Sequence, residues 1–180
     1  MEDKERVSEE RVITLYMKQG NVEVRKSNIQ GKGVFALRDF KKGEEVFRYK
    51  RGKFIKKENI SSLSEDERNS LDFVDADIYE LMEPLGSFVN HSCDPNTVEQ
   101  LGEKEIVSFA FKPIKAGDEI TVDYRVRAFD EWKLDCMCNS KNCSEIVAGS
   151  FFSLPEHLQK QYLSFAPKFI KEEYQRRNHT

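Results

Sequence analysis

The chain has 180 residues, of which 38% are hydrophobic and 34% charged, and its formal net charge is −3. This length fits one domain with modest extensions and a small core. The charge balance excludes the basic footprint of a nucleic-acid-binding protein, and an acidic surface favours a basic partner. No apolar stretch approaches the ~20 residues that span a bilayer.

The first ten residues are charged throughout and lack the apolar run of a secretory signal. We therefore expect an intracellular, reducing compartment, cytoplasmic or nuclear, without direct contact to nucleic acid or membrane. Residues 1–21 are predicted to be an N-terminal extension. Its apolar cluster at 12–17 is compatible with a short helix or with partial disorder.

From Val22 onward the pattern is that of short β-strands separated by Gly, Asp, Asn and Pro turns. Two turns, at 41–44 and 115–118, share the form Lys-x-Gly-acid, and each precedes a strand. The expected strands are residues 22–24, 33–37, 46–49, 85–89, 106–111 and 120–124.

Two helix starts are indicated by a serine followed three residues later by glutamate. Ser64 and Glu67 form a capping box that opens a short helix, and Ser153 and Glu156 form a second that opens an amphipathic helix. Pro167 is expected to break or kink the second helix. The prediction is one mostly-β domain with short helices, a helical insertion and a helical tail.

Three of the four cysteines form a C-x-C-x4-C cluster, at 136, 138 and 143, and the fourth is Cys93. Closely spaced thiolates on a tight loop supply three ligands of a tetrahedral zinc site, and Cys93 would complete it. Four ordinary thiols are the alternative. A site of four thiolates is closed and therefore structural, because catalytic zinc keeps an open position. It would also hold the neighbours of Cys93 close to the segment before Cys136.

Three further motifs follow one another along the chain. They are G-K-G at 31–33, N-H-S-C-D-P-N at 90–96 and G-D-E-I-T-V-D-Y at 117–124. The first two read singly as turns, and a lone histidine is more often structural than catalytic. In this order, with the cysteine cluster behind them, they closely resemble the SET-domain lysine methyltransferases with a post-SET zinc loop. The resemblance covers about residues 22–150 and fits the short, stand-alone members of that family.

The resemblance implies a SET-domain (β-clip) fold of small curled sheets, whose C-terminal segment threads through a loop as a pseudoknot. This arrangement would place the strand end at 90–91 beside residues 123–124. The implied parts are a SET domain at 22–129 with a substrate-selecting insert at about 54–84, a post-SET zinc region at 130–150 and a helical tail at 151–180.

The implied activity is transfer of a methyl group from S-adenosylmethionine to a lysine amine of a basic protein, a histone or another. Tyr124 matches the family's catalytic tyrosine, beside the transferring methyl, and Tyr49 matches the tyrosine that lines the lysine channel. The implied cofactor-binding residues are Lys32, Gly33, Val34, Asn90, His91 and Tyr124. The implied ligands of one structural zinc are Cys93, Cys136, Cys138 and Cys143.

The chain departs from the family pattern in several places. Many members carry Gly-Asn and then Arg before N-H-S-C, whereas residues 83–88 here read E-P-L-G-S-F, so a polar cofactor contact is missing. Phe151 and Phe152 are candidates for the post-SET aromatic that covers the adenine, and core residues are the alternative. Position 122, often Phe or Tyr in the family, is the smaller Val122. A roomier channel and di- or trimethylation are therefore expected, unless Glu99 holds a water there.

Two other interpretations stay open. One is a catalytically weak SET-fold binding module, since the arginine is missing. The other is a purely structural zinc domain in which Tyr49 and Tyr124 are core aromatics. Binding of S-adenosylmethionine would exclude the structural domain, and turnover on a lysine peptide would exclude the binding module.

Overall fold

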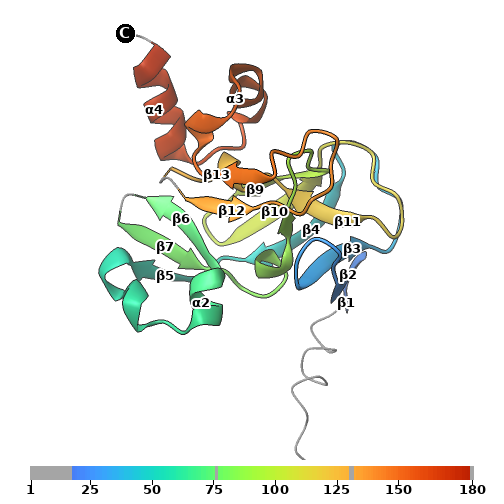
Figure 1. Ribbon diagram of the computed structural model, residues 1–180. Helices are drawn as coiled ribbons and strands as arrows, with labels where there is room; N and C mark the ends of the chain where they lie inside the picture. Colours follow the sequence, from blue (N-terminus) through green and yellow to red (C-terminus); the bar gives the residue numbers. More distant parts are fainter. Residues whose placement is uncertain (1–17, 76, 130–131, 179–180) are drawn as a thin grey trace, which may run out of the picture.

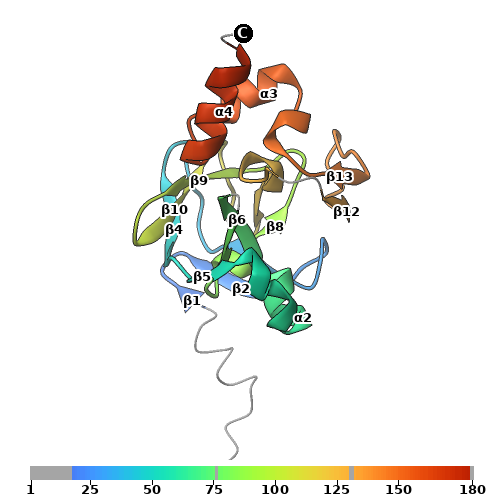
Figure 2. The same ribbon diagram turned by 90° about the vertical axis from the view of Figure 1, so that its left-hand side faces the viewer.

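The computed structural model describes residues 18–75, 77–129 and 132–178, whose strands form four small sheets (Figure 1). The expectations for residues 12–17, and for most of the extension at 1–21, lie outside the described residues. Helices α3 (Glu156–Tyr162) and α4 (Lys168–Asn178) lie together at one end of the molecule in both views (Figures 1 and 2). None of the helices in this described part combines the length and apolarity needed to cross a membrane.

The largest sheet carries two of the three motifs at its centre. In spatial order its strands are β1 (Lys18–Gln19), β2 (Val22–Lys26), β3 (Lys32–Ala36), β11 (Glu119–Val122) and β8 (Asn90–His91). β8 runs parallel to β11, and the other neighbours pair antiparallel. Val22, Val34 and Ile120 are fully buried in a core shared with the second sheet.

The second sheet is antiparallel, in the order β4 (Glu45–Lys50), β10 (Glu105–Ala110) and β9 (Thr97–Leu101). Along β10 fully buried and half-buried residues alternate, as the two-residue period of a strand requires. The strands predicted at 22–24, 33–37, 46–49 and 106–111 are confirmed. Strand β11 ends at Val122, two residues before the predicted end.

The two Lys-x-Gly-acid turns adopt the same structure. Gly43 and Gly117 have φ values of 87° and 91°, in the left-handed region that favours glycine. In each turn the acid accepts a hydrogen bond from the backbone N–H three residues earlier. The shared sequence pattern therefore corresponds to a shared backbone conformation.

The insert is a third sheet, so the predicted helical insertion is wrong in its main feature. Its strands are β5 (Lys53–Lys56), β7 (Ile78–Leu81) and β6 (Leu71–Asp75), and η1 (Lys57–Ser62) and α2 (Glu65–Asn69) connect them. The capping box is confirmed, because Ser64 Oγ accepts from Glu67 N–H and the Glu67 carboxylate accepts from Ser64 N–H. The helix that the capping box opens, α2, is only five residues long. Pairing of β5 and β6 with β7 makes the remainder of the insert a sheet.

The strand predicted at 85–89 is also wrong. A 3-10 turn, η2 (Gly86–Phe88), occupies this segment, and the strand β8 begins only at Asn90. Leu85, with a φ of 84°, lies in a turn directly ahead of η2. The apolar run therefore enters the core through a turn.

After β11 the chain forms η3 (Tyr124–Val126), the hairpin of β12 (Lys133–Asp135) and β13 (Ile146–Ala148), and then η4 (Phe151–Ser153). The second capping box is wrong, because Ser153 Oγ donates to the carbonyl oxygens of Ala148 and Ser150. Pro155 is the N-cap of α3 and supplies no side-chain cap. Pro167 separates α3 from α4, as predicted.

Candidate active site

The parallel pairing of β8 with β11 brings two motifs together. Thr121 lies opposite Asn90 and Val122 opposite His91, so Tyr124 follows directly beside the histidine. The backbone N–H of Tyr124 donates to His91 Nδ1 at 3.2 Å, and the two ring centroids are 5.3 Å apart. The expected proximity of residues 90–91 and 123–124 is thus observed.

His91 is buried and neutral. Burial lowers the pKa of His91 to about 4, although the nearby Asp123 carboxylate opposes the shift. Because Nδ1 accepts from the Tyr124 amide, the ring proton is on Nε2, which lies 3.4 Å from Cys93 Sγ. The histidine therefore connects Tyr124 to the first cysteine of the cluster.

Asn90 holds the glycine-containing loop in place. Its Nδ2 donates to the carbonyl oxygens of Gln30 and Lys32, at 3.1 and 3.0 Å, and to Glu119 Oε1 at 2.7 Å. The same carboxylate accepts from Ser27 Oγ at 2.8 Å. Glu119 belongs to the G-D-E-I-T-V-D-Y motif, but no role was predicted for its side chain.

Gly33 and Val34 follow this loop in strand β3. A Cβ on Gly33 would lie 2.2 Å from Glu119 Oε1, so glycine is required for the carboxylate to reach Asn90. The Val34 side chain is fully buried in the core, which leaves only backbone for contact with a ligand. Lys32 is exposed, with Nζ 5.5 Å above the Phe88 ring.

Two hollows meet at Tyr124. The smaller is lined by Ile29, Gln30, Asn90, His91, Tyr124, Leu134, Asp135, Cys136 and Met137. The larger is a long groove that runs to the insert, and its lining includes Lys32, Tyr49, Val122 and Trp132 as well as Tyr124. The two predicted tyrosines therefore line one groove. The predicted cofactor residue His91 lines the smaller hollow, and Asn90 lines both.

Both tyrosines are neutral phenols whose hydroxyl protons are already used. Tyr49 Oη donates to Glu99 Oε1 at 2.8 Å, and Tyr124 Oη donates to the Val89 carbonyl oxygen at 2.8 Å. Burial raises the pKa of both Tyr49 and Tyr124, and the Glu99 carboxylate raises each further. The lone pairs of each phenol oxygen therefore remain available to accept hydrogen bonds from other groups.

Gly86, which the sequence analysis did not single out, makes room for Tyr49. A Cβ at this position would lie 2.3 Å from Cε2 of the Tyr49 ring. The Tyr49 ring also stacks on Phe47, with ring centroids 6.0 Å apart. In the sequence, the indication of a close contact at this position is a glycine between the larger residues Leu85 and Phe88.

Among the aromatic residues of the C-terminal region, Trp132 lies beside Tyr124, with ring centroids 6.4 Å apart. Phe151 is fully buried in the second core, and Phe152 contacts Phe129 edge to face and lies under Arg177. Phe151 and Phe152 are therefore part of the second core, which was the alternative to a role in covering the adenine.

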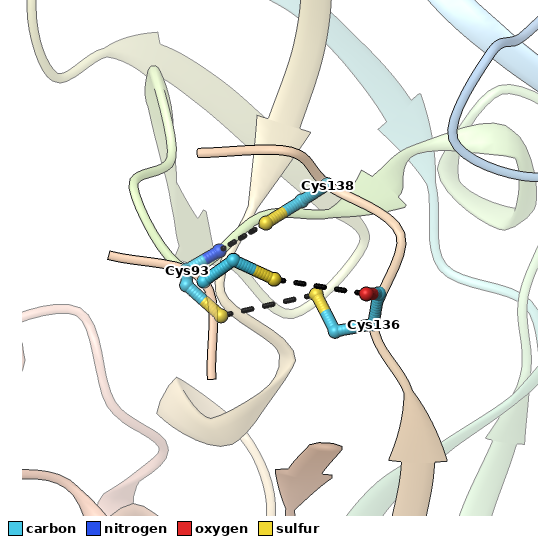
Figure 3. A group of neighbouring side chains, drawn as sticks. Cys93, Cys136 and Cys138 are labelled. Atoms are coloured by element: carbon cyan, nitrogen blue, oxygen red, sulfur yellow. Dashed lines mark hydrogen bonds between the residues drawn. The ribbon is translucent and has the colours of Figure 1, made fainter. Parts of the chain in front are cut away.

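The four cysteines form one cluster, with all four sulfur atoms within 4.8 Å of one another. Figure 3 shows Cys93, from the motif after β8, facing Cys136 and Cys138. Cys93 Sγ lies 3.8 Å from Cys136 Sγ, and the Cys93 N–H donates to Cys138 Sγ at 3.5 Å. All four cysteines are free thiols. This donor set fits a single tetrahedral thiolate site for a metal ion.

The surroundings of the sulfurs favour at least one thiolate. Burial works against ionisation of Cys138, but hydrogen bonds from Ser140 and from the Cys93 amide outweigh it and lower the pKa of Cys138 to about 6. Burial raises the pKa of Cys136. A bound cation would compensate that cost, because a coordinating thiol loses its proton.

A family model described as "SET domain" matches residues 31–125. The match covers more than half of the chain and contains all three motifs, and the mostly-β architecture agrees with it. The chain belongs to the SET-domain family.

The similar curated proteins are much longer than this chain. The histone-lysine N-methyltransferase trithorax of Drosophila virilis is 32% identical over an alignment of 142 residues, which covers 70% of this chain and 4% of that protein. Human histone-lysine N-methyltransferase 2B is 34% identical over an alignment of 142 residues, which covers 70% of this chain and 5% of that protein. The chain therefore spans about a twentieth of these relatives. A crystal structure from Plasmodium falciparum is 24% identical with a TM-score of 0.48, and the match covers 59% of this chain and 95% of that one.

Proposed function

We propose that this chain is a protein-lysine N-methyltransferase that uses S-adenosylmethionine. The observation that carries the proposal is the meeting of Asn90, His91 and Tyr124 at the head of a groove that Tyr49 also lines. Membership of the SET family and relatives that are named histone-lysine N-methyltransferases support it. We also retain the proposed division into a SET domain at 22–129, an insert at about 54–84, a post-SET region at 130–150 and a tail at 151–180.

The cofactor, when bound, supplies an electrophilic sulfonium methyl group, and the residues of the chain orient the two reactants. Because Tyr49 and Tyr124 donate their protons to Glu99 and to the Val89 carbonyl, each offers lone pairs to the substrate. An acceptor binds an N–H of the lysine amine and leaves the nitrogen lone pair free to attack. The same oxygens accept weak C–H···O contacts from a methyl group. Most of the rate gain comes from alignment.

The nucleophile must be the neutral amine, and a desolvated aromatic channel disfavours its ammonium form. Tyr49 is buried and Val122 is half-buried, so a lysine side chain between them would lose most of its water. Tyr49 and Tyr124 remain neutral, so neither adds a negative charge that would stabilise the ammonium. Desolvation therefore favours the reactive form, and the Glu99 carboxylate in the same groove is paired with Arg127.

For the cofactor we propose the hollow at the β8–β11 junction, lined by Asn90 and His91 with Tyr124 at its edge. Asn90 Nδ2 is committed to loop carbonyls and Glu119, which leaves its Oδ1 to accept from the amino group of the cofactor. Lys32, which lines the neighbouring groove, would supply an exposed ammonium for the carboxylate of the cofactor. Gly33 and Val34 line neither hollow, and for them we propose contacts through the backbone alone.

Trp132 is proposed as the aromatic residue that covers the adenine. It lines the groove beside Tyr124, and Gly149 packs so tightly on its indole that a Cβ there would lie 2.3 Å from Nε1. A flat ring fixed in this way presents a face on which a base stacks.

We propose that Cys93, Cys136, Cys138 and Cys143 hold one structural zinc ion. The cluster joins the motif after β8 to the hairpin of β12 and β13, which supplies Leu134 and Asp135 to the smaller hollow. The metal would therefore fix one wall of the proposed cofactor pocket.

The proposed substrate is a lysine in a basic protein, a histone or another, and the proposed location is nuclear or cytoplasmic. The net charge of −3 and the names of the relatives support a basic partner. Direct nucleic-acid and membrane binding are not part of the proposal. The oligomeric state is left open.

The test is transfer of a labelled methyl group from S-adenosylmethionine to purified histones and to a protein lysate, followed by mass spectrometry of labelled proteins. The proposal expects label on lysine side chains, lost in Tyr124→Phe. Cofactor binding by calorimetry without any transfer would support the SET-fold binding module instead. Absence of cofactor binding would leave the structural zinc domain.

A further inference from the structure

A cluster of buried charges joins three distant parts of the fold. Asp72 comes from β6 of the insert, Glu99 from β9 and Arg127 from the residue after η3. Arg127 Nη1 lies 2.7 Å from Glu99 Oε2, and Arg127 Nη2 contacts Asp72 Oδ2. All three side chains are less than one-fifth exposed.

The positive charge of Arg127 offsets the cost of burying the carboxylates of Asp72 and Glu99. Burial alone would lower the pKa of Arg127, but the carboxylates of Asp72 and Glu99 raise it, so the guanidinium stays charged. A planar guanidinium offers several N–H donors in a fixed fork and can serve two carboxylates at once. Lysine is a point charge and cannot reproduce both contacts in one geometry.

Glu99 links Arg127 to Tyr49, because each of its two carboxylate oxygens accepts a hydrogen bond from a different residue. Oε2 accepts from Arg127, while Oε1 accepts the hydroxyl proton of Tyr49 at 2.8 Å. With the carboxylate fixed by Arg127, the Tyr49 O–H has one direction available. Since Gly86 packs against the Tyr49 ring, neither the ring nor its hydroxyl is free to reorient.

We infer that Arg127 is a positioning residue that links the insert, through Asp72 and Glu99, to the hydroxyl orientation of Tyr49. This inference rests on the proposed methyltransferase function, in which the Tyr49 oxygen faces the substrate amine as an acceptor. The position of the insert sheet and the geometry of the lysine channel are thereby coupled. A shift of the insert on substrate docking reaches Tyr49 through three side chains.

The insert contains a second buried pair that provides a matched control. Glu80 is fully buried, Arg51 Nη2 contacts its carboxylate at 2.5 Å, and Gly52 N–H donates to Glu80 Oε1 at 2.6 Å. None of these contacts involves Tyr49 or Glu99. Glu80→Gln therefore weakens a buried ion pair of the insert without altering the hydrogen bond to Tyr49.

The experiment is a double-mutant cycle in the full chain with Glu99→Gln and Tyr49→Phe, with Glu80→Gln as control and Arg127→Lys as the conservative variant. Initial rates on a lysine peptide give kcat and KM. We expect Glu99→Gln to lower kcat by about tenfold to a hundredfold, with a much smaller change in KM for the cofactor. In the Tyr49→Phe background the same change should cost less than about twofold, since the contact is already lost. Arg127→Lys should give an intermediate loss.

Equal losses from Glu99→Gln in both backgrounds would overturn the inference, and so would an equal loss of kcat in Glu80→Gln. If the wild-type chain transfers no methyl group, the proposed function fails, and hydrogen exchange still decides the linkage. Arg127→Lys should then accelerate amide exchange in both β4 and β6, whereas Glu80→Gln should accelerate it in the insert alone. Unchanged exchange in β4 of Arg127→Lys would refute the link.

Discussion

The backbone N–H of Tyr124 donates a hydrogen bond of 3.2 Å to Nδ1 of His91, a residue 33 positions earlier in the chain. The contact follows from the parallel register of β8 on β11, and it determines which nitrogen of the imidazole carries the proton. It also places the Tyr124 ring where the two hollows meet. Support of the proposed catalytic residue therefore depends on strand pairing and on the cysteine cluster next to His91.

Tyr124→Phe should lower kcat by about a hundredfold while the fold and most cofactor affinity persist. The hydroxyl donates to Val89, and losing one such bond costs only about 1 kcal/mol of stability. Steady-state kinetics and thermal unfolding measure the two effects separately. Tyr174→Phe, in the second core, is the matched control. Global unfolding of Tyr124→Phe would show that the tyrosine is structural.

One zinc ion per chain is expected from metal analysis of the purified protein. Cys93→Ser should release it and loosen the β12–β13 hairpin, because metal binding contributes folding free energy. Ser144→Ala is the control, since Ser144 Oγ lies 3.4 Å from Cys93 Sγ and yet supplies no thiolate. A folded, active protein without bound metal would contradict the proposal.

Gly33→Ala should weaken S-adenosylmethionine binding by about tenfold or more, because the new Cβ displaces the Glu119 carboxylate from Asn90. Titration calorimetry gives the affinity. Gly52→Ala, which crowds the Leu81 carbonyl in the insert, should destabilise the chain and leave cofactor affinity unchanged. Equal losses of affinity in both variants would assign the effect to general stability.

Asp72 predicts a pH dependence of stability between about pH 4 and 6. Burial raises the pKa of Asp72 to about 6, against the opposing effect of Arg127, whereas an unfolded aspartate titrates near 3.9. Between these values the unfolded chain has released the proton and the folded chain retains it. The Asp72 contribution to the free energy of unfolding therefore falls as pH rises, by at most about 2 to 3 kcal/mol.

Denaturant unfolding of wild type and Asp72→Asn at several pH values measures this contribution as a difference between two curves. The difference should change through the pH 4–6 window and level off above it. A difference that grows in favour of the wild type as pH rises would show that the ion pair with Arg127 dominates the burial of Asp72.

Exhaustive treatment of a good substrate should yield di- or trimethyl-lysine. Val122 lines the groove with Tyr49 and cannot hydrogen-bond, and the Glu99 oxygens are already bonded to Tyr49 and Arg127. Val122→Tyr should shift the products towards fewer methyl groups, as measured by mass spectrometry. An unchanged distribution in that variant would show that Val122 does not face the lysine channel.

Several features were predictable because they are local. The strands around Val34 and Ile106 follow from short apolar runs, and the two Lys-x-Gly-acid turns follow from a glycine with positive φ. The capping box at Ser64 needs only four consecutive residues. The cysteine spacing pointed to a metal cluster, and the described sulfurs do converge.

The tertiary structure decided what depends on partners distant in sequence. The insert became a sheet because β5 and β6 pair with β7, and Ser153 lost its cap role because carbonyls at 148 and 150 accept its hydroxyl. Glu119, Arg127 and Gly86 have roles defined only by the groups that long-range folding places against them. The sequence by itself thus determined the family, several strands of the first two sheets and the candidate metal ligands. The three-dimensional packing decided where each hydroxyl proton points, since hydrogen-bond partners are chosen by proximity in space.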